Sequence, residues 1–231
     1  MTDVSGKHIL VVGATGELGG RIARRLDDLG AELTLTGTSA GRLADLGIRG
    51  RHIVVDLRTQ AGTLVPLVLK SSGRLDGVVI AAGVVAFGAA SDLPESTLAD
   101  LFAVNATGPM LVIASALDAL TASAAEGDDP FIVTISGIVA ERPMAGMAAY
   151  SASKAALAAF SQATARELRR SGVRVIDARP GHTETGLATR AIAGDAPPFP
   201  AGLDPDRVAD RIVAAIVSGE RDLPSSAFEP M

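Results

Sequence analysis

Short apolar runs alternate with helix-like segments along the whole chain, and this pattern constrains the fold more than any other feature. Six runs rich in Val, Ile and Leu are near-continuously apolar, as strands covered on both faces are. Alternation of such strands with helices is typical of a parallel sheet with helices on both sides. The sequence therefore predicts a doubly wound parallel α/β sheet, in a single domain spanning residues 1–231. The expected strands are 7–12, 33–36, 53–55, 78–81, 131–135 and 173–178, and the expected helices are 17–29, 41–47, 60–70, 94–122, 150–170 and 205–217.

Composition narrows the class of protein. The absence of Cys excludes disulfides, thiolate catalysis and Cys-ligated metals. A net charge of −5 without any block of Lys or Arg argues against a nucleic-acid partner. No apolar run approaches the roughly 18 residues that span a bilayer, and the polar segment 1–7 is not a secretory signal. We therefore expect a cytoplasmic protein with a small-molecule substrate and no membrane partner.

A glycine-rich turn joins the first expected strand to the first expected helix, where residues 13–20 read GATGELGG. Glycine allows a tight turn and a close approach of backbone to a pyrophosphate, and the helix N-terminus offers free N–H groups to that anion. The turn predicts nucleotide binding, although a single glycine-rich turn can also merely cap a helix. Because Glu17 is an awkward neighbour for phosphate, its side chain is expected to point to solvent.

The end of the second strand indicates which dinucleotide would bind. No acid stands there, since the sequence continues Gly37-Thr38-Ser39. An acid would hold the ribose diol of NAD and repel the additional phosphate of NADP. Its absence, with Thr38 and Arg42 nearby, favours NADP(H), while NAD(H) and an ordinary loop are the alternatives. Asp56, after the third strand, is expected either to meet the adenine or to cap the next helical turn.

The only tyrosine stands four residues before one of only three lysines. Tyr150 and Lys154 would share one face of a helix. A phenol with a pKa near 10 is a poor acid or base at neutral pH, whereas a nearby ammonium lowers that pKa. The pair therefore predicts general acid–base chemistry. A surface pair, with Tyr150 at the edge of the core and Lys154 in solvent, is the competing interpretation.

With these motifs the chain resembles the short-chain dehydrogenase/reductase family over essentially its whole length. The resemblance implies a Rossmann-type fold that binds NAD(P) at the glycine turn, and catalysis by Asn, Ser, Tyr and Lys. Tyr150 and Lys154 match the last two, and Asn105, the only Asn, looks like the family's Asn, whose distorted helix supports a water in the proton relay. Lys154 would also hold the nicotinamide ribose, and residues 180–185 the nicotinamide amide, while Asp56 matches the acid that contacts adenine. The full set of expected cofactor contacts is Gly13, Thr15, Gly16, Leu18, Gly19, Thr38, Arg42, Asp56, Leu57, Ala82, Gly83, Tyr150, Lys154, Pro180, Gly181, Thr183 and Thr185.

Three positions depart from the family's pattern. Gly16 lies one place before the usual second glycine, and Ala81 replaces the Asn of an Asn-Ala-Gly segment, at an expected cost in stability rather than in cofactor binding. The family's Ser lies thirteen residues before the Tyr, and Gly137 stands there. Ser136 is our candidate for that role if the chain bends or bulges at the strand end, because neighbours on a strand point to opposite faces. The alternative is that Ser136 only caps the strand.

Two classes of function follow. The first is an NAD(P)(H)-dependent oxidoreductase that interconverts a carbonyl and an alcohol on a small organic substrate, with Tyr150 as the general acid or base. The second, suggested by Gly137, is a catalytically weakened NADP-binding regulator or scaffold. An epimerase or dehydratase acting on nucleotide sugars is disfavoured, because the length leaves no room for an additional substrate domain.

Other expectations concern the substrate and the assembly. Residues 142–144 and a mobile substrate loop at about 183–203 should line the substrate cavity. His182 is expected to be a loop hydrogen-bonder rather than a base, and no metal site is expected. The resemblance implies a homo-oligomer, a dimer or tetramer formed through long helices, and the Ala-rich helix 150–170 would permit close helix approach. Packing of the same small residues on the sheet is the competing interpretation.

Overall fold

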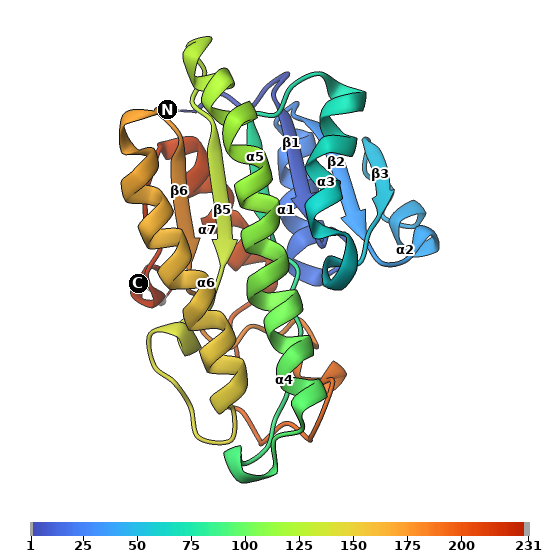
Figure 1. The fold of residues 1–231 in the computed structure, drawn as a ribbon, viewed down its shortest axis with the longest axis vertical. Coiled ribbons are helices and arrows are strands. Elements are labelled where there is room, and N and C mark those ends of the chain that lie inside the picture. The colour runs from blue at the N-terminus through green and yellow to red at the C-terminus, as the bar shows by residue number, and fades with distance from the viewer. Residues whose placement is uncertain (1, 229–231) are drawn as a thin grey trace.

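The computed structural model describes residues 2–228 and holds one six-stranded sheet with the strand order β3-β2-β1-β4-β5-β6 (Figure 1). All neighbouring strands are parallel. The sequence predicted this doubly wound α/β architecture, and each expected strand is found to within two residues at either end. The strands are β1 (His8–Val12), β2 (Glu32–Gly37), β3 (Arg51–Val54), β4 (Gly77–Ile80), β5 (Phe131–Ile135) and β6 (Arg174–Ala178).

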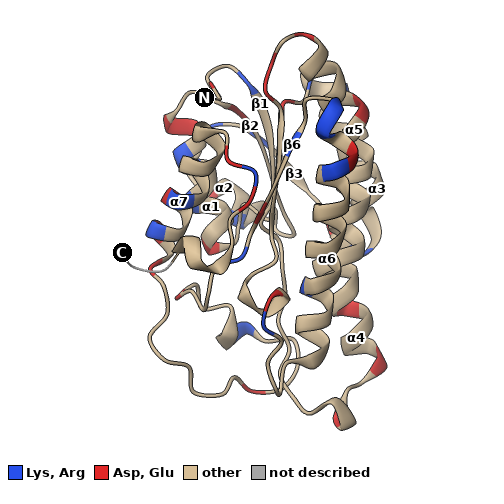
Figure 2. Ribbon diagram, turned by 90° about the vertical axis from the view of Figure 1, so that its left-hand side faces the viewer, with Lys and Arg blue, Asp and Glu red and all other residues tan. Residues whose placement is uncertain are grey.

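Helices cover both faces of the sheet. Figure 2 shows α1, α2 and α7 on one side and α3 to α6 on the other. The long helical stretch expected at 94–122, with an interruption near Gly108 and Pro109, is divided by a π-helical turn at Ala103–Thr107, immediately before those two residues. The α-helices are α1 (Glu17–Asp28), α2 (Ala40–Ala44), α3 (Leu57–Ser72), α4 (Glu95–Phe102), α5 (Gly108–Ala125), α6 (Ala148–Glu167) and α7 (Pro205–Ser218).

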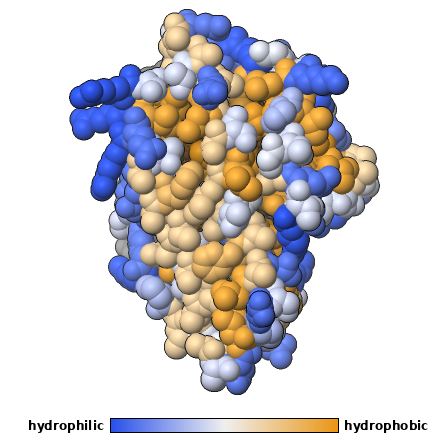
Figure 3. Space-filling view, in the orientation of Figure 1, coloured by the Kyte–Doolittle hydropathy of each residue, from blue (hydrophilic) through white to orange (hydrophobic). Residues whose placement is uncertain are grey.

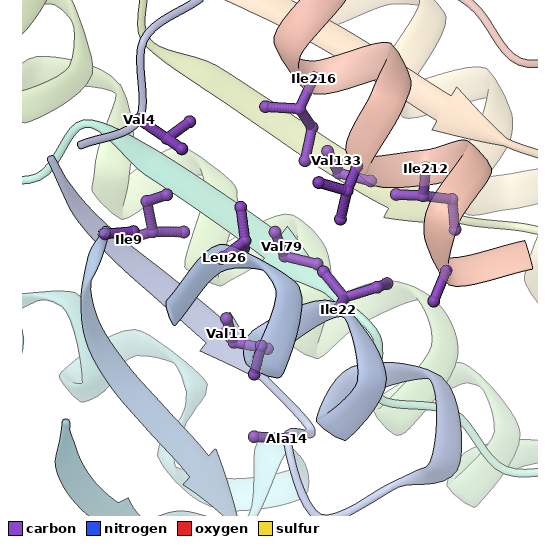
Figure 4. Packing of buried hydrophobic residues seen from close by; sticks show 14 of the residues in the cluster. Val4, Ile9, Val11, Ala14, Ile22, Leu26, Val79, Val133, Ile212 and Ile216 are labelled. Atoms are coloured by element: carbon purple, nitrogen blue, oxygen red, sulfur yellow. The ribbon is translucent and has the colours of Figure 1, made fainter. Parts of the chain in front are cut away.

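Two hydrophobic cores, one on each face, explain why the strands are continuously apolar. Successive side chains of a strand point to opposite faces. Ile9 and Val11 of β1 accordingly pack in the core under α1 and α7, whereas Leu10 and Val12 pack in the core under α3 and α5. Figure 4 shows the first core, in which strand residues meet α1 and α7. A polar residue on either face would lie in one of these cores.

The strand order reverses between β1 and β4, and this reversal positions the functional site. From β1 the chain moves outward to β2 and β3, then returns to β4 and continues to β5 and β6. The connections on the two sides of this point leave in opposite directions, which opens a crevice at the carboxyl ends of the strands. The chain segments that follow each strand therefore meet at one edge of the sheet.

The helical stretch Glu95–Ala125, which comprises α4, the π turn and α5, is long and apolar enough to cross a membrane by length and composition. The expectation that no stretch approaches this size was therefore wrong. Half of its apolar window is buried inside the protein, and the core helices of soluble proteins pass the same test. Its length and composition alone are thus weak evidence for a membrane span.

Candidate functional site

A cavity of about 570 Å³ lies at the carboxyl edge of the sheet, where the strand order reverses. Residues that follow all six strands line it, together with the N-terminal part of α6. All predicted cofactor contacts except Gly19 are among the lining residues, as are Ser136, Gly137 and Glu17. Residues chosen from six separate segments of the sequence thus meet around one cavity.

The glycine turn approaches two other parts of the backbone closely. A Cβ on Gly13 would lie 2.6 Å from the amide nitrogen of Ala82, at the end of β4. A Cβ on Gly19 would lie 2.2 Å from the carbonyl oxygen of Gly13, so Gly19 shapes the turn from behind the cavity. The residue before α1 is Gly16, which has no side chain to cap the helix, so the N–H groups of the first turn are left for another acceptor. The side chain of Glu17 is about half exposed, as expected.

Basic groups border the end of the cavity near β2 and β3. Arg42 donates a hydrogen bond from Nη2 to the carbonyl oxygen of Thr15, 2.6 Å away. Asp56 accepts a hydrogen bond of 2.9 Å from the backbone N–H of Arg58 and so caps α3, which confirms the second of the two roles expected for it. The sequence reasoning did not identify Arg58, which also lines the cavity. Its guanidinium Nη1 lies 3.3 Å from Oδ1 of Asp56.

Tyr150 and Lys154 stand in the first two turns of α6 and both line the cavity. Lys154 is buried, and its Nζ donates a hydrogen bond of 2.8 Å to the carbonyl oxygen of Ile135, at the end of β5. The same Nζ lies 6.0 Å from the centroid of the Tyr150 ring. The competing interpretation, a surface pair with a solvated Lys154, is therefore wrong.

Burial governs the protonation of both groups. It raises the pKa of Tyr150 to about 12, so the expected lowering of that pKa by the ammonium is not found. Burial also lowers the pKa of Lys154 to about 8, and the carboxylate of Asp177 opposes this change. At neutral pH Tyr150 is therefore a protonated phenol and Lys154 an ammonium. This arrangement holds a proton donor at the cavity wall.

Asn105 lies inside the π turn and is completely buried. Its Oδ1 accepts a hydrogen bond of 2.9 Å from the N–H of Val84, while its Nδ2 donates to the carbonyl oxygen of Val84 at 2.9 Å and to Ser153 Oγ at 3.0 Å. The side chain therefore fixes the segment after β4 to α6, and it does not line the cavity. The helix distortion expected at Asn105 is present. The sequence reasoning did not identify Ser153, a small residue between Tyr150 and Lys154.

Ser136 and Gly137 follow β5, and the chain bends at this point. The N–H groups of both residues donate to the same carbonyl oxygen, that of Ala178, at 3.1 and 3.2 Å. Nevertheless the Ser136 side chain is completely buried, and its hydroxyl donates a hydrogen bond of 2.7 Å to Oδ2 of Asp177. The bend thus joins the end of β5 to β6, which favours the second alternative for Ser136. Gly137 has φ +79° and ψ 167°, a backbone conformation almost restricted to glycine.

The other end of the cavity is apolar. Val85, Phe87 and Met147 form a small buried cluster against which Tyr150 and Phe199 pack. The loop that contains Phe199 is attached to the segment after β4 by two backbone hydrogen bonds, from Phe87 to Ala193 at 2.9 Å and from Ile192 to Val85 at 2.8 Å. Of the expected segment 142–144, only Met144 lines the cavity.

His182 stacks on Phe199 with ring centroids 4.7 Å apart, and its Nε2 lies 3.6 Å from Oε1 of Glu184. Its ring therefore supports the substrate loop. Among residues 2–228 no group of three or more His, Asp and Glu side chains that could hold a metal ion is found.

A family model described as short chain dehydrogenase matches residues 7–195. The chain belongs to the short-chain dehydrogenase family. As a member of this family the protein is an oxidoreductase, and its relatives are named as oxidoreductases or dehydrogenases. The Rossmann-type fold implied by the resemblance is the fold that the structure shows.

Relatives cover most of the chain. An uncharacterized oxidoreductase of Methylorubrum extorquens is 32% identical in an alignment 205 residues long, which covers 84% of this chain and 80% of that protein. The 2,3-dihydro-2,3-dihydroxybenzoate dehydrogenase of Escherichia coli is 30% identical over 185 residues, 80% of this chain and 73% of that protein.

Solved structures of the family have the same fold. A metagenomic short-chain oxidoreductase in complex with NADP has a TM-score of 0.80 and 27% identity, covering 96% of this chain and 98% of that chain. A short-chain dehydrogenase from Streptomyces avermitilis has a TM-score of 0.83 and 27% identity, covering 96% and 89%.

Besides Arg58 and Ser153, sequence reasoning missed a pair of buried charges in this short-chain dehydrogenase. Asp177 and Arg179 are both buried beside Ser136 and connect β6 to the end of β5. A signal was present, because three charged residues, Arg174, Asp177 and Arg179, occur within and just after β6, whose other residues are apolar. Buried charges are rare unless paired, so such residues in a predicted core strand indicate a polar cluster.

Proposed function

We propose that this short-chain dehydrogenase interconverts a carbonyl and an alcohol with NADP(H), and that Tyr150 is its general acid and base. The observation that carries the proposal is the cavity itself, with the Tyr150–Lys154 pair in one wall and the glycine turn at the other end. When bound, the cofactor supplies hydride to a carbonyl carbon or accepts it from an alcohol. The residues of the chain supply the proton and the positioning.

The cavity residues fit a dinucleotide. Backbone without side chains forms the wall at Gly13, Gly16 and Gly83, and a Cβ on Gly83 would crowd the Nζ of Lys154 at 3.3 Å. The glycine turn would hold the pyrophosphate at the N-terminus of α1. Lys154 would hold the ribose nearest the nicotinamide, and residues 180–185 the nicotinamide amide.

Near neutral pH the protonation state of Tyr150 suits the proton transfer that carbonyl reduction needs. Tyr150, with its pKa raised by burial, can donate a proton to a carbonyl oxygen but is a poor base near neutral pH. Lys154 places a positive charge beside the phenol and would stabilise the phenolate that remains after donation. Ser136, whose hydroxyl is committed to Asp177, would act on the substrate only after that hydrogen bond breaks.

NADP(H) is our preferred cofactor. Thr38 and Arg42 line the cavity where the second strand ends, and no acid stands between Gly37 and Arg42. A guanidinium can bind a phosphate through two parallel hydrogen bonds. Solved relatives hold NADP or NAD, so they support a nicotinamide cofactor, and the preference rests on Thr38 and Arg42.

The cavity favours a substrate whose part beyond the reacting carbonyl group is apolar. Beyond Tyr150 its lining is mainly hydrophobic, from the segment after β4, from the segment after β5 and from the substrate loop. We therefore propose a small aldehyde or ketone that carries an aliphatic or aromatic group. The residues of this part are Val85, Phe87, Ile138, Val139, Met144, Met147, Leu187, Ala188, Phe199 and Pro200.

Assembly and location stay predictions. Leu98 of α4 and Leu111 of α5 are exposed, and Figure 3 shows a largely apolar surface over the face that α5 and α6 present in that view. We propose that this face forms a homo-oligomer contact, which light scattering at micromolar concentration would refute by showing a monomer. The cytoplasmic location also stays a prediction, which microscopy of the tagged protein can test.

Replacement of Tyr150 by Phe tests the proposed function. Turnover of a panel of apolar aldehydes and ketones with NADPH should be lost, because the chain has no second tyrosine to supply the proton. Binding should persist, measured from the fluorescence of NADPH itself, since the chain has no Trp to interfere. Substantial remaining turnover would refute the role of Tyr150. If the unaltered protein binds NADPH but reduces no member of the panel, the regulator or scaffold hypothesis is favoured.

A further inference from the structure

A buried carboxylate joins the two strands nearest Lys154. Asp177, on β6, is 4% exposed. Its Oδ1 accepts a hydrogen bond of 2.8 Å from Thr134 Oγ1, and its Oδ2 accepts one of 2.7 Å from Ser136 Oγ. The two donors flank Ile135, whose carbonyl oxygen accepts the hydrogen bond from Lys154 Nζ. Asp177 thus binds the two neighbours of Ile135, the residue to which Lys154 donates its hydrogen bond.

Arg179 balances the charge of this carboxylate. Its Nη1 donates to Oδ2 of Asp177 at 3.0 Å, and its other guanidinium nitrogens reach Glu141 and Asp222. Arg179 is itself only 7% exposed. One buried cation therefore meets three carboxylates. Loss of one carboxylate would still leave Arg179 with two partners, which limits the damage expected from a single substitution.

Few other charges surround Lys154. The titratable neighbour of Lys154 on α6 is Tyr150. The π turn contributes the neutral amide of Asn105, and the segment after β4 contributes Gly83. β5 contributes the carbonyl oxygen of Ile135, which accepts the hydrogen bond from Lys154, and β6 contributes Asp177. Asp177 is the one carboxylate among these neighbours, with Arg179 behind it.

We propose that Asp177 is a positioning residue for Lys154: its carboxylate clamps the end of β5 through Thr134 and Ser136, the two neighbours of the residue whose carbonyl oxygen accepts the hydrogen bond from Lys154, and it places a negative charge at that end of the strand. An opposite charge stabilises a buried ammonium against the desolvation that disfavours it. The hydroxyl of Ser136 serves this clamp. The inference rests on the proposed function only in assigning Lys154 a part in the reaction, because the state of Lys154 can be measured without turnover.

The test is Asp177→Asn, which preserves the shape of the side chain and removes its charge. The chain contains only three lysines, so the 13Cε signals of [13C]lysine-labelled protein can be assigned with Lys7→Arg and Lys70→Arg variants. The titration midpoint of Lys154 should fall by about one pH unit or more. The alkaline decrease of kcat/KM should move to lower pH by the same amount. Absence of turnover in every variant, with the Lys154 shift present, would contradict the proposed function but not this inference.

Glu141→Gln is the matched control, because it removes another carboxylate from Arg179 and leaves Asp177 in place. Its Lys154 midpoint should equal that of the unaltered protein. An unchanged midpoint in folded Asp177→Asn, or an equal fall in Glu141→Gln, overturns the proposal. If Asp177→Asn does not fold, Arg179→Met decides: removal of the competing cation should raise the Lys154 midpoint, and a midpoint that is unchanged or lower overturns the proposal.

Discussion

Serine at position 137, where the family has its catalytic Ser, is expected to destabilise this protein. The backbone of Gly137 has φ +79° and ψ 167°, a region that residues with a Cβ almost never adopt. A Cβ at this position would meet only the carbonyl oxygen of Pro180, at an ordinary 3.6 Å, so lack of space does not oppose the substitution. The cost is therefore that of the backbone conformation, about 1–3 kcal/mol in the free energy of unfolding.

Urea denaturation followed by far-UV circular dichroism measures this cost for Gly137→Ser. Gly62→Ser is the matched control, because Gly62 is an exposed residue in α3 with nothing within 4 Å of a Cβ. That substitution should not destabilise, since Ser has a somewhat higher helix propensity than Gly. Equal m-values in all three proteins would show that the denatured states are comparable.

A loss smaller than about 0.5 kcal/mol in Gly137→Ser, within the range of ordinary surface substitutions, would refute this reasoning. It would mean that the end of β5 is not held in a glycine-only conformation. No large gain of carbonyl reduction is expected, because the backbone conformation at position 137 disfavours a residue with a Cβ. A strong gain would instead identify a weakened enzyme.

Other predictions concern the cofactor, the buried amide and the pH profile. Arg42→Ala should raise the Kd for NADPH about tenfold or more, with little effect on NADH measured in parallel, since a charged hydrogen bond contributes roughly 1.5–3 kcal/mol. Asn105→Ala should lower the free energy of unfolding by about 2–4 kcal/mol in urea, because it leaves the N–H and C=O of Val84 without their partner. Gly19→Ala should weaken NADPH binding in a fluorescence titration, because the new methyl group would lie 2.2 Å from the carbonyl oxygen of Gly13, and Gly62→Ala should not. The kcat/KM for carbonyl reduction should fall above about pH 8, since the ammonium of Lys154 is present below that pKa and lost above it, and a level profile to pH 10 would contradict this.

The sequence determined the fold and the place of the site. Continuously apolar strands separated by helices are buried on both faces in a parallel sheet that has a hydrophobic core on each side. The residues of β1 show this, because they alternate between the two cores. The spacing of Tyr150 and Lys154 places both on one side of a helix wherever that helix packs. These features depend on local periodicity and chain order, which a sequence contains.

Only the tertiary structure decided what surrounds those residues. The direction of the Ser136 hydroxyl depends on Asp177, which lies 41 residues away on the adjacent strand. The expected lowering of the Tyr150 pKa is not found because burial, to which the apolar cluster formed by separate loops contributes, raises that pKa. The left-handed backbone of Gly137 could not be read from the residue type, since glycine occurs in many conformations. The direction of a side chain, its desolvation and the pairing of buried charges depend on residues that are neighbours in space. Such residues are far apart in the sequence, so the sequence alone does not show which of them meet.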